Sequence, residues 1–415
     1  MRIVHLGLGN FFRAHQAWYT DRANRESSQH WSITGVCMRR PLLRDMLVQQ
    51  DCAYTLEISD VGGRQMHKIE VLDSVLVAAE EPQKVISAIA DENTAIVTLT
   101  VTEKGYDLKA DGRLNRESAN IRSDLEQGTH RSMVGLLATA LKARSSRNAP
   151  LTIMSCDNLP RNSRQLRQAV LEFSELAGMG IADYLDRFVS FPCTMVDRIT
   201  PATDAALEAR VAETTLPPRA PVSAEMFTDW IIEDDFSGPR PKWELAGVSF
   251  VDDVAPFELR KLRMLNGPHS YVAYAGILAG YAYVHEAIAD PVIRRVTELI
   301  MDEAMATLPP RSRNDGAAHK ASLLRRFENP FLHHGLRQIT NDGSVKLPLR
   351  VLPVIEARAA MGLPSPGCEA LLAAWQRFLE AEIECGRDLH DPSATELRLF
   401  IQQGADAASI LEALK

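Results

Sequence analysis

Short apolar runs alternate with helical patterns over the first part of the chain. Continuous apolar stretches at residues 2–8, 32–36, 71–77, 95–102 and 151–155 are typical of buried strands, and helical spacing fills residues 11–24, 82–89 and 133–144. Parallel strands covered on both faces give apolar runs separated by helices. This alternation therefore predicts an α/β domain with a doubly wound, Rossmann-type parallel sheet.

Beyond about residue 250 the pattern changes to long helices. Helical spacing at residues 270–285, 291–306 and 369–384 predicts a mainly α-helical C-terminal domain. Proline-rich segments at 217–221 and 238–241 indicate loops shortly before the change. We therefore divide the 415-residue chain into a Rossmann domain over 1–248 and a helical domain over 249–415, since one ordinary core would not cover this length.

The composition excludes several classes of protein. Hydrophobic residues make up 46% and charged residues 24%, and the net charge of -8 does not favour a nucleic-acid or anionic-membrane surface. No apolar run reaches about eighteen residues, and the N-terminal apolar stretch is too short for a signal peptide, so we expect a cytoplasmic protein. The six cysteines form no Cys-x-x-Cys pair, and we expect buried free thiols and no metal site.

A glycine turn, Gly7-Leu-Gly9, follows the first predicted strand and precedes a helix. Such glycines allow the backbone to turn tightly and to approach a pyrophosphate, but the third position of the usual fingerprint is Phe12. Arg13 would add positive charge there or lie on the helix surface. The second strand is followed by Met38-Arg39-Arg40 rather than by an acidic residue, which leaves both NAD(H) and NADP(H) open.

Two later strands end in polar clusters, Thr102-Glu103-Lys-Gly-Tyr106 and Ser155-Cys-Asp157-Asn158. Ligands bind beyond the carboxyl ends of strands in open α/β sheets, so both clusters are candidates for a site. Asp, Asn and Ser also favour turns and helix caps, which is the alternative for both clusters.

The run Lys261-Leu-Arg-Met-Leu-Asn266-Gly-Pro-His269 places an amine, an amide and an imidazole within nine residues. A lysine with a lowered pKa can accept a proton, and an amide and an imidazole can hold the oxygen of an alcohol or ketone. At α-helical spacing the three side chains fall within an arc of about 140°. Pro268 predicts a kink or a new helix start near Gly267. A charged residue followed by a helix cap is the alternative to catalysis.

Taken together, five runs resemble the polyol-specific long-chain dehydrogenases, the mannitol dehydrogenase family, over nearly the whole chain. They are Gly7-Leu-Gly-Asn10-Phe11-Phe-Arg13-Ala-His-Gln, Thr102-Glu103-Lys-Gly-Tyr, Cys156-Asp-Asn158-Leu-Pro, Met195-Val-Asp197-Arg-Ile-Thr-Pro and the run from Lys261 to His269. The resemblance implies a Rossmann domain, a helical domain, an active site in the cleft between them, and metal-independent alcohol–ketone interconversion with a nicotinamide cofactor.

The resemblance also implies roles for individual residues. Lys261 would be the general base in oxidation, and Asn158 and Asn266 would donate hydrogen bonds to the reacting oxygen. His269 would bind a substrate hydroxyl, and Asp197, Arg337 and Lys346 would complete the substrate pocket. Cofactor contacts would come from Gly7, Gly9, Asn10, Phe11, Arg13 and Glu103, of which Glu103 also matches a residue linked to proton exit. NAD(H) is the expected cofactor, with NADP(H) as the alternative.

The substrate is expected to be a sugar acid or a polyol, bound by a monomer or a weak homo-oligomer. The run Phe191-Pro-Cys-Thr-Met-Val-Asp197 looks more like the fructuronate reductase (mannonate oxidoreductase) branch, so D-mannonate/D-fructuronate is our first choice. Mannitol 2-dehydrogenase and the arabinitol and tagaturonate enzymes are the alternatives within the family. A non-catalytic dinucleotide-binding protein and a metal-dependent alcohol dehydrogenase are the alternatives outside it. Shortened ends and Pro268 distinguish this chain from typical members.

Overall fold

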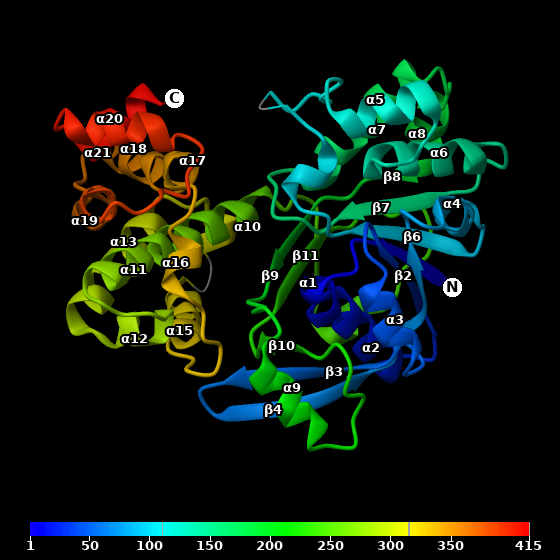
Figure 1. Cartoon of the computed structure of the whole chain (residues 1–415), viewed down its shortest axis with the longest axis horizontal. Coiled ribbons are helices and arrows are strands. Elements are labelled where there is room, and N and C mark those ends of the chain that lie inside the picture. The colour runs from blue at the N-terminus through cyan, green and yellow to red at the C-terminus, as the bar shows by residue number, and fades with distance from the viewer. Residues whose placement is uncertain (110, 314–315, 415) are drawn as a thin grey trace. The chain divides into compact units, whose positions relative to one another are not determined.

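Strand β1 (Arg2–Leu6) lies inside a six-stranded parallel sheet with the order β5-β2-β1-β6-β7-β8 (Figure 1). The other strands are β2 (Ser32–Cys37), β5 (Leu72–Val77), β6 (Thr94–Leu99), β7 (Leu151–Ser155) and β8 (Val189–Ser190). Every residue of β6 and β7 is buried, which explains their apolar sequences. The predicted doubly wound sheet is confirmed, and the strand order reverses between β1 and β6.

The computed structural model describes residues 1–109, 111–313 and 316–414. The chain divides into two structural units, Met1–Ser59 with Arg64–Ala255, and Asp60–Gly63 with Pro256–Lys415. The first unit contains the parallel sheet, and the second unit is helical. We refer to them as the sheet unit and the helical unit.

The helices of the sheet unit lie between its strands along the chain. They are α1 (Asn10–Ala14), α2 (Gln16–Glu26), α3 (Leu42–Val48), α4 (Pro82–Ala90), η1 (Glu103–Tyr106), α5 (Ala119–Gln127), α6 (Met133–Ser145), α7 (Asn162–Leu176), α8 (Ala182–Phe188), α9 (Ala205–Ala212) and η2 (Trp243–Ala246). The helix expected over 11–24 is divided in two at His15, whose backbone leaves the helical region at φ -123° and ψ -88°.

Seven strands were not predicted from the sequence: β8 in the parallel sheet and six strands in two smaller sheets. β3 (Tyr54–Asp60), β4 (Gly63–Ile69) and β10 (Val222–Glu225) form one sheet, and β9 (Thr194–Asp197), β11 (Asp229–Glu233) and β12 (Ser249–Val251) form another. β4 is mostly polar and partly exposed, and the other sheet joins strands of three to five residues that are distant in sequence. β4 and the strands of the second small sheet give no clear hydrophobic period, whereas β3 alternates Tyr54, Leu56 and Ile58 with polar residues and was missed.

The helical unit is built around α11 (Gly267–Leu278), which contacts α12, α13, α16 and α19. Val272, Ala273 and Tyr274 of α11 are almost fully buried. The elements of this unit are α10 (Ala255–Arg260), η3 (Lys261–Asn266), α12 (Val284–Ala289), α13 (Pro291–Ala306), α14 (Pro310–Arg313), α15 (Gly316–Phe327), α16 (Leu336–Ile339), α17 (Gly343–Arg350), α18 (Leu352–Ala360), α19 (Pro366–Glu384), α20 (Ala394–Gln402) and α21 (Ala407–Ala413).

The helix predicted over 291–306 is confirmed, whereas the one predicted over 270–285 is wrong at its end. Asp290 caps α13 by accepting hydrogen bonds from the backbone N–H groups of Val292 and Ile293. α11 ends at Leu278, because Gly280 adopts a left-handed backbone (φ 88°) and the Glu286 carboxylate then starts α12 by accepting from the N–H of Tyr283.

Five of the six cysteines are buried and unpaired, as expected, but Cys385 at the end of α19 is exposed. The expectation of a buried thiol is wrong there because α19 ends at the surface. Within the described residues, no helix has the length and apolar character needed to cross a membrane.

Replacing Gly7 by alanine is expected to destabilise the sheet unit by about 3 kcal/mol, because two costs combine. Gly7 has φ 98°, and a Cβ atom would lie 2.1 Å from the backbone oxygen of Thr100. Gly9→Ala is the matched control, since its Cβ would meet only the Gly7 oxygen, at 3.6 Å. Urea unfolding of both variants measures the difference. Equal stabilities would contradict the steric argument.

Candidate active site

The glycine turn at the end of β1 is held from inside the protein by Arg13. The Arg13 guanidinium donates hydrogen bonds to the Gly9 carbonyl (3.3 Å), to the Asn10 side chain (2.7 Å) and to the Ala220 carbonyl. Burial lowers the pKa of Arg13 to about 10, so it stays charged at neutral pH. The surface position considered for Arg13 is therefore wrong. Its guanidinium stabilises the turn through the hydrogen bonds to Gly9 and Asn10.

Phe12, at the third fingerprint position, is fully buried and stacks on His5 with ring centroids 3.5 Å apart. His5 lies within hydrogen-bond distance of the hydroxyls of Thr98 (2.8 Å) and Thr100 (2.9 Å), and burial lowers its pKa to about 3. The Thr100 hydroxyl also donates to the Gly7 carbonyl. This network ties the turn to β6. Phe11 is less buried and stacks on His15.

The carboxylate of Asp157 joins the loops that follow β6 and β7. It accepts hydrogen bonds from the backbone N–H groups of Val101 (3.1 Å) and Thr102 (2.9 Å) and from the Tyr106 hydroxyl (2.7 Å). Burial raises the pKa of Asp157, while these donors favour its ionised form. Asp157 was predicted only as a member of a polar cluster, and its role in joining the two loops could not be inferred from the sequence.

The predicted site residues Glu103 and Asn158 follow directly on the two loops that Asp157 joins, and both side chains are exposed. Asn162 adds a second tie, because its amide donates to the carbonyls of Asp157 (3.0 Å) and Thr194 (2.9 Å). Thr194 begins β9, which ends at the buried Asp197. Asn162 therefore fixes the end of β7 relative to the strand that carries Asp197. The sequence analysis did not single out Asn162.

In the helical unit, Lys261 and Asn266 are the first and last residues of a π-helical segment between α10 and α11. The N–H of Gly267 donates to the carbonyl of Leu262, five residues earlier. α11 starts at Gly267 with Pro268 in its first turn, as expected from the proline. The arc of about 140° assumed a regular α-helix, so it does not describe this segment.

Arg350 at the end of α17 holds the backbone beside Asn266. Its guanidinium donates to the Asn266 carbonyl (3.3 Å) and to the Ser270 hydroxyl (3.0 Å), which itself donates to the same carbonyl. The junction between the π-helical segment and α11 is therefore supported by a distant helix. Neither Arg350 nor α17 was associated with Asn266 from the sequence.

His269, in the first turn of α11, stacks on Phe327 with ring centroids 5.2 Å apart and lies 5.0 Å from the ring of His334. Burial lowers the pKa of His269 well below its usual range. Neighbouring charges lower it further, those of His334, Arg350, Arg326 and Lys346. His269 is therefore a neutral donor or acceptor at neutral pH. Lys346 therefore lies near enough to His269 for its charge to affect the pKa of the imidazole.

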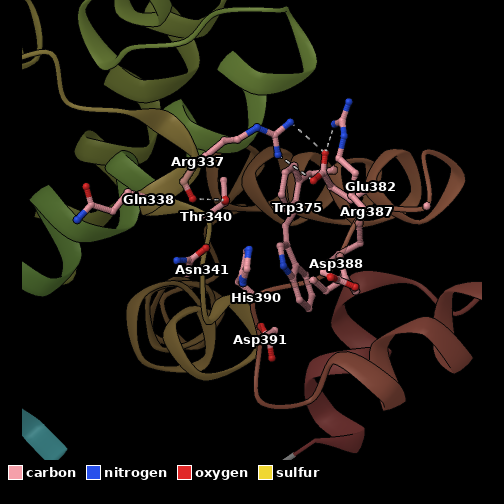
Figure 2. A pocket seen from close by; sticks show the side chains of 14 residues that line it. Arg337, Gln338, Thr340, Asn341, Trp375, Glu382, Arg387, Asp388, His390 and Asp391 are labelled. Carbon is pink, nitrogen blue, oxygen red and sulfur yellow. Dashed lines mark hydrogen bonds and ion pairs between the residues drawn. The ribbon is translucent and has the colours of Figure 1, made fainter.

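Arg337, in α16, lines a pocket of about 680 Å³ between α16, α19 and the segment 386–391. Figure 2 shows its guanidinium directed at the Glu382 carboxylate, to which it donates at 2.9 Å. Arg387 binds the same carboxylate at 2.6 Å. These pairs partly neutralise both arginines, and the role predicted for Arg337 in substrate binding stays a prediction.

Lys346, which the resemblance places in the substrate pocket, and the nearby motif residue Arg198 also have structural partners. The Lys346 ammonium donates to the Asn341 carbonyl at 2.6 Å. Arg198 is buried in the sheet unit, where it donates to the carbonyls of Ala14 and Glu225 and lies over the ring of Trp18. These contacts give Arg198 a structural role inside the sheet unit.

Comparisons with known proteins cover nearly the whole chain. The family model described as the mannitol dehydrogenase Rossmann domain matches residues 1–245, and the mannitol dehydrogenase C-terminal domain matches residues 253–415. D-mannonate oxidoreductase from Escherichia coli is 36% identical over 426 residues, covering 99% of this chain and 87% of the relative. D-arabinitol 4-dehydrogenase from Ralstonia nicotianae is 36% identical over 387 residues, covering 91% and 84%.

A solved structure is similar in both units. Mannitol 2-dehydrogenase from Pseudomonas fluorescens, in a ternary complex with NAD and D-mannitol, is 35% identical with a TM-score of 0.84. The match covers 99% of this chain and 85% of that chain. A sugar-acid enzyme and two polyol enzymes thus have nearly the same identity to this chain, so overall identity does not distinguish their substrates.

Replacing Asp157 by asparagine is expected to lower kcat about 10- to 100-fold, since small displacements of catalytic groups have effects of this size. An amide cannot accept from all three donors, because its NH₂ group would face one of them. Steady-state kinetics measure the loss, with Asp111→Asn as the control on an exposed turn, where the carboxylate accepts one backbone N–H. Equal activities of the two variants would show that the Asp157 carboxylate does not position the site.

Proposed function

Because the chain belongs to the mannitol dehydrogenase family, we propose that it is a fructuronate reductase that interconverts D-mannonate and D-fructuronate with NAD(H). The family membership makes it an oxidoreductase that acts on a CH–OH group of a polyol or sugar acid. We propose further that its substrate is a sugar acid, that its cofactor is NAD(H), and that the reaction needs no metal.

The observation that carries the choice of a sugar acid is the charge around His269. Arg326, Lys346 and Arg350 lie near enough to lower the pKa of His269. A positive potential beside a substrate-binding histidine favours an anionic substrate over a neutral polyol. The resemblance of the run ending at Asp197 to the fructuronate reductase branch and the similarity to D-mannonate oxidoreductase agree with this choice.

The glycine turn fits a dinucleotide. A Cβ atom at Gly9 would lie 3.6 Å from the Gly7 carbonyl oxygen, an ordinary van der Waals contact. Steric contacts within the protein therefore do not require glycine at this position. A pyrophosphate that passes close to the backbone does require it. We assign Gly7, Gly9, Asn10, Phe11 and Glu103 to the cofactor, with Arg13 holding the turn. When bound, NAD(H) would accept or supply the hydride. The solved relative contains NAD, which favours NAD(H) over NADP(H).

The remaining chemistry belongs to side chains of this protein. The Lys261 ammonium would give its proton to the ketone oxygen during reduction, and the neutral amine would take it back during oxidation. The amides of Asn158 and Asn266 would donate hydrogen bonds to that oxygen as its negative charge develops. His269 would hold a neighbouring hydroxyl, and Asp197, Lys346 and Arg337 complete the proposed set.

The purified protein tests this proposal with four substrates. D-fructuronate, D-tagaturonate and D-fructose are offered with NADH or NADPH, and D-arabinitol with NAD or NADP. We expect the highest kcat/KM for D-fructuronate with NADH, because its carboxylate meets the positive potential near His269. A higher kcat/KM for D-fructose or D-arabinitol than for both uronates would contradict the proposed reaction, and a preference for NADPH would contradict the cofactor.

Replacing Lys261 by alanine is expected to lower kcat about 100- to 10,000-fold, the usual contribution of a positioned general acid or base. The affinity for NADH, followed by its fluorescence, should change little because the glycine turn is in the sheet unit. Lys142→Ala on the exposed side of α6 is the control for removing a lysine. A Lys261→Ala enzyme with near wild-type kcat would exclude the proton-transfer role.

A further inference from the structure

Two histidines of the helical unit face each other, and only His269 has a role so far. The ring centroids of His269 and His334 lie 5.0 Å apart and the rings are tilted by 57°. Nε2 of His269 and Nδ1 of His334 are both buried, and neither has a hydrogen-bond partner among the described residues. Buried polar atoms are normally satisfied, so these two nitrogens on adjacent rings are open to a further partner, either an ordered water or a polar group of a ligand.

The backbone holds His334 in place. Its carbonyl accepts a hydrogen bond from the N–H of Val284 (3.0 Å), and Tyr283 pairs with Gly335 in an isolated antiparallel bridge. The N–H of Leu336 donates to Ala282 on the other side of this bridge. The segment that carries His334 is therefore fixed to the connection between α11 and α12. His269 is fixed on its own side by stacking on Phe327, so both rings are preorganised.

The charge around His269 is positive, and the ring of His334 lies 5.0 Å from that of His269. Burial lowers the pKa of His334 to about 4, and burial together with Arg326, Lys346 and Arg350 lowers that of His269. Both rings are therefore neutral near pH 7, and each can donate one N–H. Two neutral N–H donors with cations near one of them suit an anionic oxygen, because hydrogen bonds to an ionised acceptor are about twice as strong as neutral ones.

We propose that His334 determines substrate specificity by donating a hydrogen bond from Nδ1 to the terminal carboxylate of a sugar acid, while His269 holds a hydroxyl of the same substrate. This role deepens the proposed function and rests on it for the position of the substrate. A polyol has a hydroxymethyl group in place of the carboxylate. That group gains little from the surrounding positive charge, so His334 distinguishes the two classes.

D-fructuronate and D-fructose test the proposal because they differ at one terminal carbon, a carboxylate in the first and a hydroxymethyl group in the second. Replacing His334 by leucine removes both ring nitrogens. We expect kcat/KM for D-fructuronate to fall about 20-fold or more, the effect of losing a hydrogen bond to a charged group, and kcat/KM for D-fructose to change less than about threefold. His333→Leu, at the exposed neighbour, should change neither.

A conservative variant separates hydrogen bonding from packing. The amide nitrogen of His334→Asn can take the position of Nδ1, so this variant should recover at least about fivefold of the loss with D-fructuronate. If the His334→Leu protein does not fold, His334→Asn is used in its place. The ratio of kcat/KM for D-fructuronate to kcat/KM for D-fructose is then compared between this variant and the wild-type enzyme. Equal losses on both ketoses, or an unchanged ratio in every variant, would overturn the role of His334.

The two proposals fail in different ways. A wild-type enzyme that prefers D-fructose contradicts the reductase assignment, whereas the change in the ratio on mutation decides the role of His334. Affinities of the NAD-loaded enzyme for D-mannonate and D-mannitol give a second measurement of the same ratio. If His334→Leu weakens both to the same degree, His334 does not recognise the carboxylate, whichever ketose the wild-type enzyme prefers.

Discussion

The three hydrogen bonds accepted by the Asp157 carboxylate hold together the strand ends that carry the polar groups of the sheet unit. Two of them come from consecutive N–H groups, of Val101 and Thr102, and Thr102 has a left-handed backbone (φ 66°). A non-glycine residue adopts this conformation at a cost that the surroundings must offset. The carboxylate does so, and it thereby fixes the direction in which the chain leaves β6 and β7. Glu103 and Asn158 each stand one residue beyond this connection, so their positions depend on it.

A different constraint acts in the helical unit, where a proline lies inside a helical run. In a regular α-helix residue 268 would donate to the Met264 carbonyl, which Pro268 cannot do. The π-helical turn before it resolves the conflict, because the Gly267 N–H bonds to Leu262 and α11 then starts with proline in its first turn. Proline is well tolerated there. π-helical turns are rare and often lie at functional sites, and this one contains Lys261 and Asn266. Arg350 supports the junction from α17, so the turn depends on tertiary structure as well as on local sequence.

The sequence predicted the features that depend on neighbours along the chain. β7 is buried on both faces and mostly apolar, which is why its residues were predicted correctly. The same reasoning failed for β4, which is mostly polar and partly exposed at the edge of a small separate sheet. Among the site residues, the turn at Gly7 followed from glycine chemistry. The burial of Arg13 did not, because its partner carbonyl at Ala220 is distant in sequence. Nothing in the sequence indicated that the ring of His334 would lie beside that of His269, 65 positions earlier in the chain.

The buried histidines connect the choice of substrate with the stability of the helical unit. A histidine whose folded pKa is depressed binds fewer protons when folded than when unfolded, so acid favours the unfolded chain. For His334, the free energy of unfolding falls as the pH decreases from the ordinary pKa of 6.5 to about 4. The total loss of stability over this pH range is on the order of 3 kcal/mol. Burial and positive charge depress the pKa of His269 in the same direction. An anion bound beside the rings would raise both pKa values and offset this cost. In the proposed site a carboxylate substrate would therefore reduce the loss of stability below about pH 6.5, whereas a neutral polyol would leave that loss unchanged.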